Sequence, residues 1–145
     1  MKMTDLQAAV GVTQLEKLPS FIEKRKTNFG ALREGLADME EHFILPEATP
    51  GSDPSWFGFP IGVRPGGRFT RNAVIQHLEE RKIATRLMFA GNITRQPAYQ
   101  NVRYRVSGSL ENTDFVMNNV FWIGVYPGIS QDMLDHVLRA FHSLV

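Results

Sequence analysis

The sequence contains no cysteine. This excludes disulfides, thiolate nucleophiles, thiolate-bound zinc and iron–sulfur clusters with cysteine ligands from this chain. The lack of cysteine fits a reducing compartment, so we expect a cytoplasmic protein. The sequence also has no apolar run that reaches the roughly 18 residues needed to cross a bilayer, and we expect no membrane partner.

The chain also has no large excess of positive or negative charge. The chain has 16 Lys and Arg against 15 Asp and Glu, which gives a formal net charge of +1. Because no strongly basic field surrounds such a chain, the composition does not favour nucleic acid as a partner. Its 145 residues, of which 43% are hydrophobic, are enough for one compact domain with a core. We therefore predict one domain over residues 1–145.

Familiar catalytic motifs are also absent. No serine lies in a glycine-flanked elbow, and no glycine-rich phosphate loop ends in Lys-Ser or Lys-Thr. The lysines lie on predicted solvated helical faces, which do not suit a Schiff-base lysine. Of the four histidines, His136 and His142 share a predicted helix but are six residues apart, not the three or four that align two metal ligands. We predict no catalytic residue and no metal site in this chain.

What is present is a regular order of helices and strands. Thr4 is placed to cap a first helix, Pro19 is predicted to end it, and a second amphipathic helix is predicted to run to Met39. A loop over 42–54 then leads to a strand over 56–63 with alternating apolar residues. Pro60 indicates an edge position for this strand, because proline cannot donate to a ladder.

The second half of the chain continues this alternation. The predicted elements are a helix over 70–82, a strand over 83–89, an arginine-rich loop over 91–108, a helix over 112–119, a strand over 121–126 and a final helix from 130. This order predicts an α+β fold in which helices cover a small, mostly antiparallel sheet.

The segment from Arg86 to Tyr99 carries the most chemistry. It reads RLMFAGNITRQPAY, with two guanidinium groups, an amide, a hydroxyl and two aromatic rings. Arginine pairs with phosphate, amides and hydroxyls bond sugar hydroxyls, and an aromatic ring can cover a sugar or a base. The segment therefore favours an anionic, hydroxylated ligand; the alternative is a solvated loop with arginines at its surface.

Four segments resemble a known family. They read MTDLQAAVGVTQLEKLPSFIEKRKTNF, GSDPSWFGFPIGV, IATRLMFAGNITRQPAY and NTDFVMNNVFWIGVYPGI. They are similar to the DegT/DnrJ/EryC1/StrS-type nucleotide-sugar aminotransferases and dehydrases that depend on pyridoxal phosphate, and most similar to the CDP-4-keto-6-deoxy-D-glucose-3-dehydrases of lipopolysaccharide biosynthesis. The resemblance implies the C-terminal small domain of a fold-type I aminotransferase, inactive alone, with the large cofactor domain outside this chain.

The same resemblance implies a reaction for the full-length enzyme. In these dehydrases, pyridoxamine phosphate condenses with the C4 ketone of a nucleotide-linked keto-sugar, a histidine takes the place of the usual Schiff-base lysine, and the C3 hydroxyl leaves. A [2Fe-2S] cluster, whose ligands lie outside this chain, and an NADH-dependent iron–sulfur flavoprotein reductase then supply electrons. The resemblance also implies a homodimer.

For the site, the resemblance places five residues on the substrate side of the cleft: Arg86, Phe89, Asn92, Thr94 and Arg95. The stretch Met88–Asn92 departs from the HYxP-like pattern of typical aminotransferases in the family, which favours the 3-dehydrase branch. Two alternatives stay open. One is a pyridoxal-phosphate-dependent aminotransferase with a lysine in the missing part; the other is a non-catalytic interaction module whose first helices bury their apolar faces against a partner.

Overall fold

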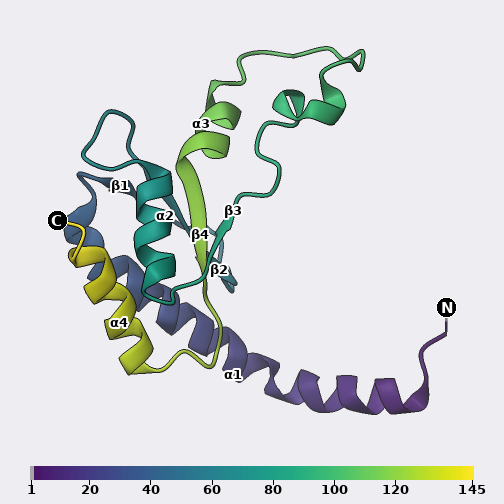
Figure 1. The fold of residues 1–145 in the computed structure, drawn as a ribbon. Helices are drawn as coiled ribbons and strands as arrows, with labels where there is room; N and C mark the ends of the chain where they lie inside the picture. The colour runs from purple at the N-terminus through teal and green to yellow at the C-terminus, as the bar shows by residue number, and fades with distance from the viewer. Residues whose placement is uncertain (1) are drawn as a thin grey trace.

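The computed structural model describes residues 2–145 as helices packed on one four-stranded antiparallel sheet (Figure 1). In chain order the elements are α1 (Asp5–Gly35), β1 (Phe43–Ile44), β2 (Gly58–Val63), α2 (Arg71–Glu80), β3 (Thr85–Leu87), α3 (Glu111–Asn119), β4 (Val120–Gly124) and α4 (Gln131–His142). The strand order is β1-β2-β4-β3, and every pairing is antiparallel. The predicted α+β class is confirmed.

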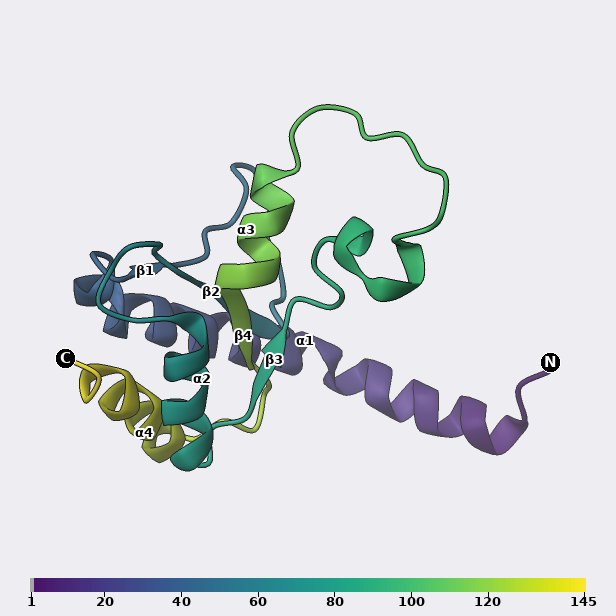
Figure 2. The ribbon, with the colours of Figure 1, turned by 45° about the horizontal axis from the view of Figure 1, so that its top comes forward.

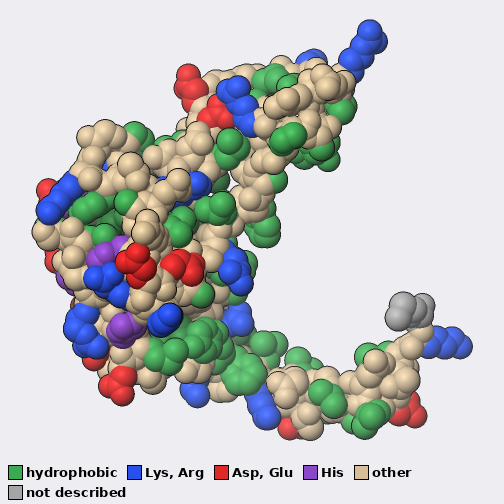
Figure 3. Space-filling view, viewed as in Figure 1, with side chains coloured by type: hydrophobic (Ala, Val, Ile, Leu, Met, Phe, Trp, Pro, Cys, Tyr) green, Lys and Arg blue, Asp and Glu red, His purple; other side chains and the backbone are tan. Residues whose placement is uncertain are grey.

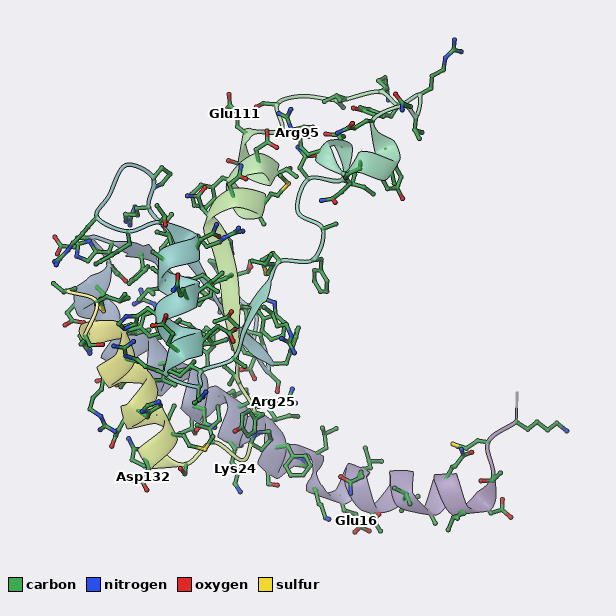
Figure 4. The ribbon with its side chains drawn as sticks, viewed as in Figure 1. Glu16, Lys24, Arg25, Arg95, Glu111 and Asp132 are labelled. Atoms are coloured by element: carbon green, nitrogen blue, oxygen red, sulfur yellow. The ribbon has the colours of Figure 1, made fainter. Side chains whose placement is uncertain are left out.

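The first helix is longer than predicted. Thr4 caps it as expected: its Oγ1 accepts from the Gln7 backbone N–H at 3.4 Å, and Gln7 Oε1 accepts from the Thr4 N–H at 3.0 Å. The prediction that Pro19 ends this helix was wrong, because α1 continues through it. Proline removes one hydrogen bond and crowds the preceding turn, but residues 11–20 are exposed all round, so the axis can bend there. Figure 4 shows this bend between Glu16 and Lys24.

The core lies on one face of the sheet. The central strands contribute large side chains that are almost completely buried: Phe59 and Ile61 from β2, and Phe121 and Ile123 from β4. Three helices supply the opposing residues, which are equally buried: Leu32 and Leu36 from α1, Val74 and Leu78 from α2, and Leu134 and Phe141 from α4. Figure 2 shows α2 and α4 side by side next to the sheet. Burial of a residue of this kind stabilises the fold by roughly 1.5–3 kcal/mol.

The position of Pro60 corrects a second prediction. β2 is not an edge strand, because it lies between β1 and β4. The Val125 N–H donates to the Phe57 carbonyl at 2.9 Å, so hydrogen-bonded pairs recur at every second residue and Pro60 lies at a non-bonded position facing away from β4. On that side β1 pairs only with Gly62 and Val63. The missing N–H of Pro60 therefore costs no ladder bond.

Two histidines connect the ends of α2 and α4. His77 Nε2 lies 2.8 Å from the Ala140 carbonyl oxygen, and His136 Nε2 lies 2.8 Å from the Arg81 carbonyl oxygen. Each histidine thus bonds a backbone carbonyl across the helix pair. Within residues 2–145 no group of three or more His, Asp or Glu side chains is placed to hold a metal ion, and no helix is long and apolar enough to cross a membrane.

Two parts of the chain project from this body. They are the N-terminal half of α1 and the loop over 88–110, which lies between β3 and α3 (Figure 1). In the space-filling view the molecule is hollowed between these two projections (Figure 3). The projecting half of α1 exposes large apolar side chains: Leu6, Val10, Val12, Leu15 and Leu18.

Candidate functional site

The 88–110 loop begins with a strained turn directly after β3. The Phe89 N–H donates to the Leu87 carbonyl at 2.8 Å, and the Gly91 N–H donates to the Met88 carbonyl at 3.1 Å. Phe89 has a φ of 47°, a left-handed conformation that a bulky residue rarely adopts, and its side chain is 84% exposed. Backbone strain of this kind persists where the surrounding structure enforces it, and it is common at binding sites.

Asn92 is the buried centre of the loop base. Only 1% of its surface is exposed. Its Nδ2 donates to Asp114 Oδ1 at 2.6 Å, while its Oδ1 accepts from the Thr94 N–H at 3.0 Å and from Thr94 Oγ1 at 2.7 Å. Because these bonds use both ends of the amide, Asn92 joins the loop to α3 and caps the short 3-10 turn Ile93–Arg95.

Arg95 binds the same carboxylate. Its Nη2 lies 3.0 Å from Asp114 Oδ2, and its Nε donates to Asp114 Oδ1 at 3.4 Å. The Arg95 guanidinium, followed by the Asn92 amide, lowers the pKa of Asp114, and Asp114 in turn raises the pKa of Arg95. We refer to Asn92, Thr94, Arg95 and Asp114 as the Asp114 cluster.

α3 is itself fixed to the body of the molecule. Arg71 Nη1 from α2 donates to the Met117 carbonyl at 2.7 Å, and Asn119 Nδ2 donates to the Val63 carbonyl at 3.2 Å. Gly91 approaches α3 closely: with a φ of 61°, it leaves no room for a Cβ, which would lie 2.8 Å from the Met117 Cα. The loop base therefore rests on a helix that is tied to both α2 and β2.

Arg86 lies on β3, just before the loop. It is directly opposite Trp122 of β4, and its Nη1 donates to the Thr85 carbonyl at 3.2 Å. The guanidinium has five N–H donors, is exposed, and forms no ion pair within residues 2–145. Next to it, Glu79 accepts from the Thr85 N–H at 2.8 Å and from Thr85 Oγ1 at 2.7 Å; these bonds, with a smaller effect of Arg86, lower the pKa of Glu79.

The loop also encloses a groove of its own. This groove has a volume of about 410 Å3, and its lining includes Thr94, Tyr99, Tyr104 and Arg105. A second cavity of about 430 Å3 lies near the start of α4 and includes none of the five predicted site residues. The rest of the lining of the loop groove is mostly apolar, with Ile93, Val102, Val106 and Leu110, so this groove suits a ligand with an apolar face and a few polar groups.

The structure separates the five predicted residues into two sets. Asn92, Thr94 and Arg95 come together in the Asp114 cluster, where their polar groups bond to one another and to α3. Arg86 and Phe89 lie before that cluster with exposed side chains. The sequence predicted Asp114 only as part of a helix start; its role was missed because nothing in the sequence pairs it with an arginine 19 residues earlier.

Comparison with known proteins agrees with this fold. The sequence model of the DegT/DnrJ/EryC1/StrS aminotransferase family matches residues 1–142. The chain belongs to this family. It is 52% identical over 97% of its length to the lipopolysaccharide biosynthesis protein RfbH of Salmonella typhimurium. It is 49% identical over its whole length to the dTDP-4-dehydro-2,6-dideoxy-D-glucose 3-dehydratase of Saccharopolyspora spinosa.

In both cases the chain spans about a third of the relative's length, 32% of RfbH and 31% of the 3-dehydratase. Similarity to a transaminase is lower: the dTDP-4-amino-4,6-dideoxy-D-glucose transaminase of Escherichia coli is 24% identical over 95% of this chain, which spans 37% of that protein. Identity to the transaminase is thus about half the identity to RfbH and to the 3-dehydratase, over a similar share of this chain.

Solved structures share the fold. The E. coli GDP-4-keto-6-deoxy-D-mannose-3-dehydratase with bound hydrated PLP superposes with a TM-score of 0.81 over 92% of this chain and 34% of that one, at 23% identity. S. venezuelae DesV in complex with a ketimine intermediate gives 0.83 over 99% of this chain and 37% of that one, at 24% identity. At these identities the likeness establishes the architecture only.

Proposed function

We propose that residues 1–145 are the C-terminal domain of a nucleotide-sugar 3-dehydrase, which removes the C3 hydroxyl of a nucleotide-linked 4-keto-6-deoxy sugar such as CDP-4-keto-6-deoxyglucose. One observation carries this proposal: over nearly the whole chain, identity to RfbH and to the Saccharopolyspora spinosa 3-dehydratase is 52% and 49%, whereas identity to a GDP-sugar 3-dehydratase and to a transaminase is 26% and 24%. The product fits the deoxysugar part of lipopolysaccharide O-antigen synthesis.

The exposed half of α1 supports a missing domain. Its apolar residues do not form one stripe but lie around the helix, for example at Leu6, Val10, Val12 and Leu15. A helix that is apolar on several sides is usually buried on several sides. We infer that the cofactor domain, outside residues 1–145, covers this half of α1.

The cofactor does not fit the residues of this chain. Lys26 is held by Asp53 at 2.7 Å and by Glu23 at 3.6 Å, and Asp53 raises its pKa, so it is a charged surface lysine and not a Schiff-base nucleophile. Arg95, a possible phosphate ligand, is paired with Asp114. We therefore assign pyridoxamine or pyridoxal phosphate to the cofactor domain.

The [2Fe-2S] cluster is assigned to the cofactor domain as well, since this chain has no cysteine. The proposal further includes a homodimer and an NADH-dependent iron–sulfur flavoprotein reductase that delivers electrons after the hydroxyl has left. Such an enzyme works where nucleotide sugars and NADH are found, in the cytoplasm.

Within this proposal the 88–110 loop forms one wall of the sugar pocket. Arg86 offers free N–H donors to the phosphates or to sugar oxygens, and the exposed Phe89 ring covers an apolar face of the sugar. Arg95 offers the N–H donors that Asp114 does not use, and Thr94 Oγ1, whose hydrogen is donated to Asn92, can still accept from a sugar hydroxyl; Asn92 sets their positions. None of these residues is proposed to transfer a proton.

The decisive experiment uses the full-length enzyme that contains this domain. We expect NADH consumption that requires the reductase and a CDP- or dTDP-linked 4-keto-6-deoxy sugar, with a 3-deoxy sugar as product by mass spectrometry. A glutamate-dependent amino sugar in its place would identify the aminotransferase alternative. Reading the residue at the Schiff-base position gives an independent check: a histidine is expected, and a lysine contradicts the proposal.

The interaction-module alternative is favoured by one feature only, the exposed apolar half of α1. It predicts that a separate protein covers this surface and that the full-length product has no activity on nucleotide sugars. Activity in the assay above excludes it.

A further inference from the structure

The 88–110 loop carries side chains proposed to contact the sugar, but it is attached to the body by few groups. Its strained turn at Phe89 is exposed, and its 3-10 turns Ile93–Arg95 and Pro97–Tyr99 contain no fully buried residue. Against this background Asn92 is exceptional, since it is 1% exposed and bonds to α3. The position of the loop must therefore depend on a small set of contacts.

Asp114 is the common acceptor of those contacts. Its two oxygens accept from Asn92 Nδ2 at 2.6 Å and from Arg95 Nη2 at 3.0 Å. These are charge-assisted bonds, which are stronger than bonds between neutral groups. Asp114 sits in the first turn of α3, where its backbone N–H donates to the Leu110 carbonyl at 2.8 Å and fixes its Cβ position. In Figure 4, Arg95 and Glu111 both lie where the loop meets α3.

The contacts of Asn92 and Arg95 with Asp114 restrict Phe89, because Asn92 and Phe89 are close in the sequence. Asn92 lies three residues after Phe89, with Gly91 packed against Met117 between them. Gln96 Nε2 also donates to the Ala90 carbonyl at 2.7 Å, which ties the strained turn back to the start of the 3-10 turns. Fixing Asn92 and Arg95 on α3 thus limits the conformations open to residues 89–91.

We propose that Asp114 is a positioning residue of the sugar site: through Asn92 and Arg95 it holds the 88–110 loop so that Phe89 faces the substrate. Asp114 itself does not touch the sugar. This inference rests on the proposed function for the identity of the substrate, but the attachment of the loop to Asp114 does not.

The first test measures the loop without using activity. Trypsin cleaves after arginine, and Arg103 and Arg105 are exposed in the loop. In the full-length protein, Asp114→Ala is expected to increase cleavage at these two residues by roughly fivefold or more, because cleavage follows the population of the open loop. Glu111→Gln is the matched control on the same helix, since Glu111 forms no ion pair with the loop in residues 2–145. Equal cleavage of wild type and Asp114→Ala overturns the proposal.

The second test separates positioning from general stability. For Asp114→Ala we expect the KM for the nucleotide sugar to rise roughly tenfold, with kcat changed much less and cofactor absorbance unchanged. Arg95→Ala combined with Asp114→Ala should cost less than the sum of the two single variants, because the two variants share the Arg95–Asp114 contact. A faster-cleaved loop with unchanged KM would mean a purely structural role and would overturn the proposal.

Two further variants keep the test decisive. If Asp114→Ala fails to fold, Asp114→Asn leaves the size unchanged but turns one acceptor into a donor that faces Arg95 or Asn92, and the same increase in cleavage and KM is expected. Asp114→Glu, which keeps the carboxylate, should restore part of the loss. If wild type shows no 3-dehydrase activity, the proposed function fails, and the cleavage rates still decide whether Asp114 holds the loop.

Discussion

At the scale of single residues, the feature with the clearest physical meaning is Phe89. A large ring that is 84% exposed gains little from burial, and a φ of 47° adds backbone strain. Neither property stabilises the domain. Both are explained if the ring is presented to a ligand, and this makes stability and activity separable by substitution.

Phe89→Gly is expected to stabilise the full-length enzyme by about 1 kcal/mol, because glycine adopts positive φ without steric cost. At the same time kcat/KM should fall about tenfold or more through loss of the ring. Thermal unfolding and steady-state kinetics measure the two effects. Phe89→Ala is the matched variant: it removes the ring but keeps the strain, so activity should fall without the gain in stability. A Phe89→Gly enzyme with full activity would contradict the proposed contact.

Glu79 allows a prediction for pH. Its pKa lies below the ordinary value of 4.5 because Thr85 donates two hydrogen bonds to the carboxylate. A lowered pKa in the folded state means that the charged form stabilises the fold above about pH 4.5, and that this contribution is lost as the pH falls through the folded pKa. We expect wild type to be more stable than Glu79→Gln at pH 7 and the difference to disappear as the pH falls below 4.5 and through the lowered folded pKa. Urea unfolding at several pH values measures it, and a difference that grows toward low pH would contradict this reasoning.

At the scale of secondary-structure elements, the close approach of α1 and α4 determines how the two helices cover the sheet. A Cβ at Gly35 would lie 2.6 Å from Leu138 Cδ1, so the absence of a side chain lets α4 pack directly on the end of α1. Gly30 lies on the same helix but has nothing within 4 Å of its Cβ position. The two glycines therefore differ in packing, and Gly35 is also the last residue of α1 while Gly30 lies inside it.

Gly30→Ala is expected to stabilise the protein by about 0.5–1 kcal/mol, because alanine is the better helix former. Gly35→Ala gains less from propensity because Gly35 is the last residue of α1, and it forces Leu138 to move, which typically costs about 1–3 kcal/mol. Urea unfolding of the two full-length variants should thus place Gly35→Ala below Gly30→Ala. Equal stability would show that Leu138 adjusts freely and that α4 is not held by this contact.

At the scale of the whole molecule, the two projections and the hollow between them fit the proposal that residues 1–145 are one domain of a longer chain (Figure 3). The projecting half of α1 makes no contact with the sheet and exposes Leu6, Val10 and Leu15. A helix that exposes large apolar side chains on several sides is normally covered by other parts of a protein. In the full-length enzyme the cofactor domain is the proposed cover.

The 145-residue chain alone is therefore expected to self-associate. Size-exclusion chromatography with light scattering should show a concentration-dependent mass above that of a monomer. Replacing Leu6, Val10 and Leu15 with glutamate should return the chain to a monomer without changing the core. As a control, Phe57→Glu changes an exposed aromatic residue elsewhere and should leave self-association intact. A monomeric wild-type chain would contradict this account of α1.

The sequence by itself determined the α+β class, most helix caps and the family, because caps, alternation and family motifs are local patterns. Thr4, Thr70 and Ser130 accept from backbone amides in the first turns of their helices, as local chemistry requires. Only the tertiary structure decided that α1 continues through Pro19 and that β2 is an inner strand, since solvent exposure and strand order depend on distant residues. The same holds for Asp114, whose partners Asn92 and Arg95 lie 22 and 19 residues away and meet it because α3 folds back on the loop.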